Sequence, residues 1–438
     1  MYTGVTAFES VKTTEYPDSL NETESSAVDP DDLFETVTLT EQVKLITTPD
    51  QDARFLEFAQ RYAAACDYVS KQAFVLGITM SSQKMHKLWY YDIRDRFDLK
   101  SQAACSVFRT VAARYKTVDT QLKEQQWKFT DPGSGKCFCF KKDIRWLQTP
   151  VSFRRPQADL ARGRDWSILK DGCTISVSTL TGREQVPFQT RKDSRLMDRR
   201  WSCGTAKLVF HETDRHWYLH ISVTAAIKPV QISDITTVAG IDRGLINLAT
   251  VRRGDITEYF RGDEAARIRS RYDRTRASLQ SKGTRGARRV LKRISGRENS
   301  WMSDINHRIS KALVSESGTL LVFEDLSGVS FDSHNLDSRT SGGRHDLRNW
   351  AFYQLETMTA YKAAMNGCIV IKVDPAYTSQ RCPCCGLIRK DSRDHSNHVY
   401  HCPECGGTWN DDEVASINLQ SLGYEYLHGI KDPKIKVS

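Results

Sequence analysis

The chain has 438 residues and a formal charge of +9, from 63 Lys and Arg against 54 Asp and Glu. This length is too great for one ordinary hydrophobic core and predicts two or three domains. Hydrophobic residues make up 39% and charged residues 27%, which excludes a fibrous chain and a wholly disordered one. No apolar run approaches the roughly 18 residues of a membrane span. No signal-peptide pattern opens the sequence, so we expect a reducing, cytoplasmic location and no membrane partner.

The charge is divided unevenly along the chain. Residues 1–50 contain eleven acids and two bases, so their net charge is −9 and residues 51–438 carry +18. A body this basic favours a polyanionic partner, although charge alone does not name one. Residues 1–35, which are rich in Ser, Thr, Asp and Glu, are expected to form an acidic disordered extension.

The first half of the chain changes pattern twice. Residues 36–50 alternate branched and polar side chains, as a half-buried strand does. Residues 51–127 repeat apolar residues at helical spacing, and residues 128–230 return to strand patterns with a hairpin at 207–225. We therefore expect a β domain, built from the first and third of these segments, interrupted by a helical insertion.

The second half alternates strands and helices, which indicates an α/β domain. Residues 237–260 read as strand, turn and strand, and residues 264–316 as an antiparallel pair of helices. An apolar strand ending in acids, an amphipathic helix and a further strand follow, at 318–328, 349–367 and 368–375.

Two C-x-x-C pairs, Cys382 with Cys385 and Cys402 with Cys405, are separated by sixteen residues. Each pair places two thiolates on one turn, and two facing turns supply a tetrahedral zinc site. Four Cys ligands leave no open coordination position, so one structural Zn²⁺ is expected. Cys384 is a spare thiol that could displace a ligand. The nearby histidines in this loop are more often solvated.

Three acids stand at the ends or beginnings of predicted elements: Asp242 after a short apolar strand, Glu324 after four apolar residues, and Asp412 at the start of a helix. Taken one at a time, these acids are typical of a turn, a solvated strand end and a helix N-cap, respectively. Together they indicate a cation site, because burying carboxylates is costly unless they bind a cation. Mg²⁺ suits oxygen ligands, and three carboxylates can hold two Mg²⁺ for phosphodiester hydrolysis.

These motifs resemble a known family. GIDRGLINLAT, LLVFEDLSG and YTSQRCPCCG…HCPECGGTWNDDEVASINL look like the three split RuvC motifs and inserted zinc ribbon of the TnpB family, transposon-encoded RNA-guided DNA endonucleases related to type V CRISPR effectors. The resemblance is strong over 236–422 and weaker over 36–228. It implies that Asp242, Glu324 and Asp412 are the catalytic, Mg²⁺-binding residues.

The resemblance leaves one choice of register open. The family pattern runs Asp, two residues, Ala, two residues, Asn, which selects Asp412 over Asp411. Val414 stands where the family usually has Asn, so Asp411 remains the alternative third acid. The acidic extension is not a typical part of the family's core.

A basic segment separates the first two acids. Residues 261–310 contain fourteen Lys or Arg and five acids. Arg suits phosphate through its planar fork, whereas a merely solvated helix face would interleave acids. We expect phosphate contacts with guide RNA or an RNA–DNA hybrid, centred on Arg285, Arg288, Arg289, Lys292 and Arg293.

The resemblance implies an α+β multidomain fold: a β-barrel-like wedge domain with inserted recognition helices, then an RNase H-like RuvC nuclease domain carrying the ribbon. The expected boundaries are 36–50 and 128–230 for the wedge, 51–127 for the helical insertion, 236–377 and 411–422 for the nuclease, 378–410 for the ribbon and 423–438 for a C-terminal tail. The implied activity is Mg²⁺-dependent, RNA-guided cleavage of double-stranded DNA beside a short adjacent motif, with guide RNA as partner.

Three alternatives stay open at this stage. A compact type V CRISPR effector would use the same chemistry with a CRISPR-derived guide. A guide-dependent regulator would bind DNA without cutting it, which the three intact acids oppose. A transposase proper would join strands, which the ribbon between the second and third acids opposes. The oligomeric state, the adjacent motif and the guide sequence are not encoded in any motif of the chain.

Overall fold

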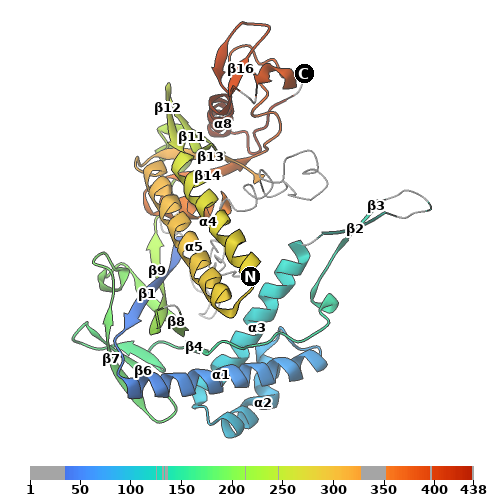
Figure 1. Ribbon diagram of the computed structural model, residues 1–438. Helices are drawn as coiled ribbons and strands as arrows, with labels where there is room; N and C mark the ends of the chain where they lie inside the picture. The colour runs from blue at the N-terminus through green and yellow to red at the C-terminus, as the bar shows by residue number, and fades with distance from the viewer. Residues whose placement is uncertain are drawn as a thin grey trace, which may run out of the picture. The chain divides into compact units, whose positions relative to one another are not determined.

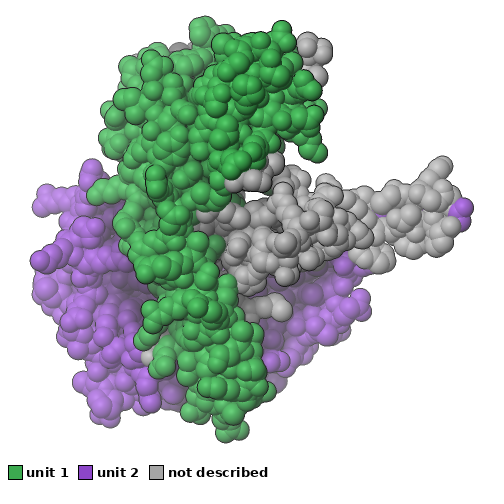
Figure 2. All heavy atoms as spheres, turned by 45° about the horizontal axis from the view of Figure 1, so that its top comes forward, with its two compact units in different colours: residues 1–37, 227–438 green, residues 38–226 purple. Residues whose placement is uncertain are grey.

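A computed structural model describes residues 35–124, 126–130, 133, 137–212, 214–244, 246–326, 352–394 and 397–436. The chain divides into two compact units, coloured separately in Figure 2. Residues 38–226 form one, here the N-terminal unit, and residues 1–37 with 227–438 the other, here the C-terminal unit. The predicted acidic extension lies outside the described residues, apart from Glu35.

The N-terminal unit is built on a seven-stranded sheet with the order β4-β8-β9-β1-β7-β6-β5. Its longest hairpin, β8 with β9, confirms the predicted pairing and closes at His211 opposite His216. A separate two-stranded ribbon, β2 with β3, pairs outside this sheet. The strands are β1 Glu35–Leu45, β2 Gln126–Thr130, β3 Cys137–Lys141, β4 Gln157–Leu160, β5 Trp166–Ile168, β6 Thr174–Ser178, β7 Arg183–Gln189, β8 Ser202–His211 and β9 His216–Ile227.

Three helices lie between β1 and β2: α1 Pro49–Val75, α2 Ser82–Phe97 and α3 Ser101–Glu124. The first begins where Thr48 accepts a hydrogen bond from the amide of Gln51 and the Gln51 side chain accepts one from the amide of Thr48. These helices occupy the segment whose periodicity predicted them.

The C-terminal unit contains a five-stranded mixed sheet with the order β12-β11-β10-β13-β14. The strands β10, β13 and β14 run parallel to one another, whereas β11 and β12 pair antiparallel. The segment read as two strands in the sequence forms three, since Gly254 at φ +52° turns the chain between β11 and β12. The bounds are β10 Thr237–Asp242, β11 Asn247–Arg253, β12 Ile256–Arg261, β13 Thr319–Glu324 and β14 Ile369–Val373.

Helices cover both faces of this sheet (Figure 1). The predicted antiparallel pair is present as α4 Asp263–Lys282 and α5 Arg285–Leu313, and α5 packs with α7 Phe352–Met365 against one face. The helix α8 Asp411–Leu427 packs on the opposite face and continues past the boundary expected at residue 422.

Backbone contact fixes α8 on the sheet. A Cβ atom on Gly240 of β10 would lie 2.0 Å from the Ser416 carbonyl oxygen and 2.4 Å from the Gln420 nitrogen. The Gln420 side chain donates to the Val238 carbonyl at 3.1 Å. Because no side chain separates helix from strand, the position of α8 follows that of β10 closely.

We expect Gly240→Ala to lower the free energy of unfolding of the C-terminal unit by about 3 kcal/mol, because the clashing atoms are backbone and α8 must move. Urea denaturation measures this change. Gly296→Ala is the matched control: it lies in α5 with nothing within 4 Å of the added Cβ, and should stabilise by up to about 1 kcal/mol. Equal stability of Gly240→Ala and the wild type would contradict this packing.

Candidate active site

Strand alternation places two of the three predicted acids on the same face of the sheet. Val238 of β10 and Leu320 and Val322 of β13 belong to the core cluster beneath α8. Asp242 and Glu324 have the same parity on these strands and therefore point to the same side. The register pairs Ile241 with Phe323. Each acid is the next residue on its strand, so Asp242 and Glu324 lie side by side at the ends of adjacent strands.

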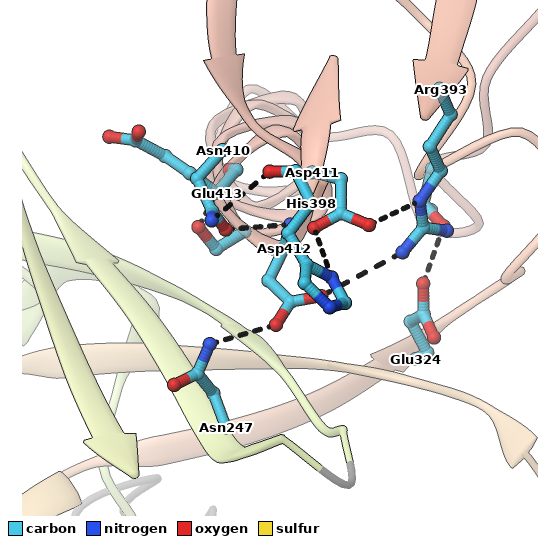
Figure 3. A network of polar contacts seen from close by, with 10 residues as sticks. Asn247, Glu324, Arg393, His398, Asn410, Asp411, Asp412 and Glu413 are labelled. Carbon is cyan, nitrogen blue, oxygen red and sulfur yellow. Dashed lines mark hydrogen bonds and ion pairs between the residues drawn. The ribbon is translucent and has the colours of Figure 1, made fainter. Parts of the chain in front are cut away.

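The third acid reaches this place from α8. Asn410 is the N-cap and accepts a hydrogen bond from the amide of Asp412 at 3.1 Å. The Asp412 carboxylate accepts through Oδ2 from Asn247 Nδ2 at 2.9 Å, which ties the first turn of α8 to β11 (Figure 3). The structure thus brings Asp242, Glu324 and Asp412 together at one edge of the sheet.

The three carboxylates interact electrostatically. Burial raises the pKa of Asp242 well above its usual value, and the charges of Glu324 and Asp412 raise that pKa further. Burial also raises the pKa of Glu324. The hydrogen bond that Thr378 donates to Glu324 Oε1 acts in the opposite direction and lowers this pKa. A cluster of like charges in desolvated surroundings is costly without a cation. The donor set therefore fits a divalent, oxygen-seeking ion.

Among the described residues, the group whose ligand atoms all lie within 4.8 Å of one another is the four-cysteine cluster, and the three carboxylates do not form such a group.

Two residues near the acids were missed by the sequence analysis. Arg393 Nε donates to Asp411 Oδ2 at 2.9 Å, and its Nη2 lies 3.7 Å from Asp412 Oδ1. Its charge lowers the pKa of both Asp242 and Glu324. Nothing in its local sequence marks this arginine, because it lies between the two cysteine pairs and meets α8 only through the fold.

Arg243 is the second such residue. Its side chain is 1% exposed and donates from Nη2 to the Glu324 carbonyl at 2.7 Å and from Nη1 to Glu356 Oε2 at 3.0 Å. Glu356 also lies 3.3 Å from Lys372 Nζ. These contacts fix the end of β13, from which the Glu324 side chain projects, against α7 and β14.

The four predicted zinc ligands form a compact cluster. Cys382 Sγ lies 3.6 Å from Cys405 Sγ, and Cys385 Sγ lies 3.5 Å from Cys402 Sγ. A zinc tetrahedron with Zn–S bonds of about 2.3 Å has edges of about 3.8 Å, so these separations fit the ion and are far too long for disulfides. The cluster can hold one zinc ion.

Cys402 and Cys405 lie on the connection between two strands of a small three-stranded sheet. Its strands are β15 Arg393–Asp394, β16 Val399–His401 and β17 Thr408–Asn410. Buried Tyr400 and two of the cysteines pack against Val414 of α8. Val414, the departure from the family pattern, therefore has a packing role here. Because Asn410 is both the last residue of β17 and the N-cap of α8, the cysteine-bearing segment continues directly into the helix with Asp412.

The predicted phosphate-binding residues lie on the first turns of α5, remote in sequence from the acids. The Thr284 side chain caps this helix at the amide of Ala287, which is buried. Spacings of three, four, seven and eight residues place the basic side chains on one helix face. All five are exposed to solvent: Arg285, Arg288, Arg289, Lys292 and Arg293.

Comparison with known proteins finds two family models that match parts of the second half of the chain. Residues 220–327 match the family model described as "Probable transposase" (OrfB_IS605), and residues 352–419 match the Cas12f1-like TNB domain. Similar curated proteins include the CRISPR-associated endodeoxyribonuclease Cas12f1 of Syntrophomonas palmitatica, 31% identical over 43% of this chain and 39% of that protein. A TnpB-like protein of Methanocaldococcus jannaschii is 26% identical over 44% of this chain and 70% of that protein.

A solved structure, the cryo-EM complex of Cas12f1 with sgRNA and target DNA, shares the fold with a TM-score of 0.53 at 10% identity. The matched region covers 88% of this chain and 99% of the Cas12f1 chain. The first two curated relatives, both Cas12f1 nucleases, are matched over 39% and 54% of their length, so the chain spans about half of them or less.

Within the described helices, none is long and apolar enough to cross a membrane.

The two matched family models cover the segments that carry Asp242, Glu324, the four cysteines and Asp412. The resemblance of this chain to the TnpB family and its type V relatives, predicted from its motifs, is therefore confirmed.

Proposed function

We propose that the protein is a transposon-associated, RNA-guided DNA endonuclease of the RuvC type. The observation that carries this proposal is the convergence of Asp242, Glu324 and Asp412 from β10, β13 and α8 at one edge of a five-stranded mixed sheet. That strand order, three antiparallel strands followed by two parallel ones, supports an RNase H-like domain. The similar Cas12f1 and TnpB-like proteins support the substrate class.

Asp242, Glu324 and Asp412 would hold two Mg²⁺ ions. When bound, these ions supply an activated water and stabilise the leaving oxygen of a phosphodiester. The chain's own residues position the ligands: Thr378 holds Glu324, Asn247 holds Asp412, and Arg243 fixes the backbone at Glu324. Cleavage by water would leave a 5′ phosphate and a 3′ hydroxyl.

The remaining parts take the roles expected from the family. The seven-stranded sheet would be the β-barrel-like wedge domain, and α1, α2 and α3 its inserted recognition helices, which together bind guide RNA and the motif beside the target. The cysteine cluster would bind one structural zinc ion and brace the segment that leads to Asp412. Base pairing with the guide would supply most of the sequence specificity.

The direct test is to purify the protein, sequence any RNA bound to it, and supply matching DNA with Mg²⁺. Cleavage that requires both the RNA and the cation supports the proposal. Strand joining in place of hydrolysis would favour a transposase, and guided binding without any cleavage would favour a regulator. A CRISPR-derived guide sequence in the bound RNA would favour the type V effector.

The exposed basic face of α5 gives a prediction of its own. Replacing its four arginines with Ala should weaken binding of duplex nucleic acid and reduce the slope of log K against log salt by roughly 0.9 for each phosphate that the variant no longer neutralises. A salt titration of binding measures this slope. The variant changes Arg285, Arg288, Arg289 and Arg293.

The matched control removes two exposed bases from the far end of the same helix, Arg308 and Lys311. It should leave the salt slope within measurement error, since the predicted phosphate-binding residues lie at the first turns. Equal slopes for the two variants would mean that the predicted face is only a solvated surface.

A further inference from the structure

Asp411, the residue before the proposed ligand Asp412, is almost fully buried, with a side chain 2% exposed. An acid in the first turn of a helix is ordinary when it lies in solvent and complements the helix dipole. The N-cap position belongs to Asn410, so Asp411 does not cap α8. A buried carboxylate at this position requires another explanation.

Its contacts all come from the cysteine-bearing segment (Figure 3). Asp411 Oδ2 accepts from Arg393 Nε at 2.9 Å. Asp411 Oδ1 lies 3.4 Å from His398 Nδ1 but receives no hydrogen bond within the described part of the chain. The backbone amide of Asp411 donates to the His398 carbonyl at 3.2 Å, which fixes the start of α8 against the loop before β16.

Arg393 is thereby shared unequally between two neighbouring carboxylates. Its Nε is hydrogen-bonded to Asp411, whereas its Nη2 remains 3.7 Å from Asp412 Oδ1, beyond hydrogen-bond distance. An arginine prefers to engage one carboxylate through two parallel hydrogen bonds. Here Arg393 does not make that arrangement with Asp412, whose Oδ2 accepts from Asn247 instead.

We propose that Asp411 is a positioning residue that keeps Arg393 from pairing fully with Asp412, so that Asp412 Oδ1 stays available to a divalent cation. The inference rests on the proposed function, because it assumes that Asp412 binds the cation. It also assigns different roles to the two adjacent acids: Asp412 faces the other carboxylates, and Asp411 faces the arginine.

A simpler role for Asp411 predicts a different dependence on Arg393. If Asp411 only added negative charge near the cation, its loss would weaken cation binding whether or not Arg393 is present. If Asp411 restrains Arg393, its loss frees the guanidinium to pair with Asp412 and compete with the cation. The effect then requires Arg393, and a double-mutant cycle separates the two roles.

The experiment uses the full-length, zinc-loaded protein and titrates Mg²⁺ alone by calorimetry. Asp411→Asn should weaken Mg²⁺ binding about tenfold, as expected for coupled residues in one ion-pair network. Asp411→Asn combined with Arg393→Gln should bind Mg²⁺ within about twofold of Arg393→Gln alone. Glu413→Gln is the matched control: Glu413 is also an acid in the first turn paired with an arginine, Arg252, and its loss should change binding less than twofold.

Each result has a definite reading. Undiminished Mg²⁺ binding by Asp411→Asn, or equal weakening in the presence and absence of Arg393, overturns the positioning role. Arg393→Gln alone tests the idea even if Asp411→Asn does not fold, since removing the competitor should leave Mg²⁺ binding at least as tight as in the wild type, and weaker binding overturns it. A wild-type protein that binds no Mg²⁺ instead refutes the proposed metal site.

Discussion

Asp242→Asn is expected to abolish RNA-guided DNA cleavage, with a loss of at least about a thousandfold, because the carboxylate is replaced by a poor cation ligand at the point where transition-state charge develops. Guided DNA binding should remain within about twofold of the wild type, since the substitution is isosteric and lies apart in sequence from the basic face of α5. Cleavage and binding assays with the same guide and target measure both quantities.

The same substitution should stabilise the zinc-loaded protein when Mg²⁺ is absent. Burial, and then the charges of Glu324 and Asp412, raise the pKa of Asp242. At a pH above the usual pKa of Asp, the carboxylate ionises more readily in the unfolded chain than in the folded one, and this lowers the free energy of unfolding. Asp242→Asn removes that cost at neutral pH, and the thermal midpoint of the zinc-loaded protein in buffer without Mg²⁺ or chelator should rise. Added Mg²⁺ should stabilise the wild type more than the variant.

Asp255→Asn serves as the control, because Asp255 is fully exposed at the turn between β11 and β12. It should cut at the wild-type rate and show no gain in stability in buffer without Mg²⁺. Cleavage by Asp242→Asn at a rate near that of the wild type would mean that the metal-site assignment is wrong.

The second large effect concerns the cysteine cluster. Cys402→Ser should release the zinc and unfold the segment around residues 378–410, because folding of so small a sheet depends on metal binding. The backbone amide of Cys405 lowers the pKa of the Cys402 thiol to about 7, which favours the thiolate that zinc requires. Zinc content by mass spectrometry under native conditions and protease resistance of the segment measure the loss.

Cleavage should fall together with the zinc content by at least about a hundredfold, since the N-cap of the helix that carries Asp412 belongs to the same segment. Cys384→Ser is the matched control: its thiol is exposed and lies outside the four-cysteine cluster. It should retain one zinc per chain and normal cleavage. Unchanged zinc content in Cys402→Ser would refute the ligand set.

Much of the site was accessible from the sequence because it depends on local patterns. The short apolar strand before Asp242 and the apolar run before Glu324 already placed the two acids at strand ends. The cysteine spacing indicated the zinc ligands in the same way. The helix pair at 264–316 followed from periodicity and is present.

The parts that could not be predicted depend on contacts between distant segments. The pairing of Arg393 with Asp411 joins a short strand to a helix through the fold of the cysteine-bearing loop. The order of the seven-stranded sheet, in which β1 lies between β9 and β7, is likewise set by long-range pairing. The sequence analysis also missed β12, because it read residues 237–260 as two strands.

The direct junction between β17 and α8 limits how this protein could be re-engineered. Each residue of an α-helix turns the chain by about 100°. One residue inserted between Asn410 and Asp411 would therefore displace the Asn410 cap and the cysteine-bearing segment from the first turn while α8 stayed seated on Gly240. A cysteine-bearing module grafted from a relative must keep the length of chain between Cys405 and Asp412 unchanged. Exchange of such modules is therefore limited more strictly by the number of residues between Cys405 and Asp412 than by the sequence of the module.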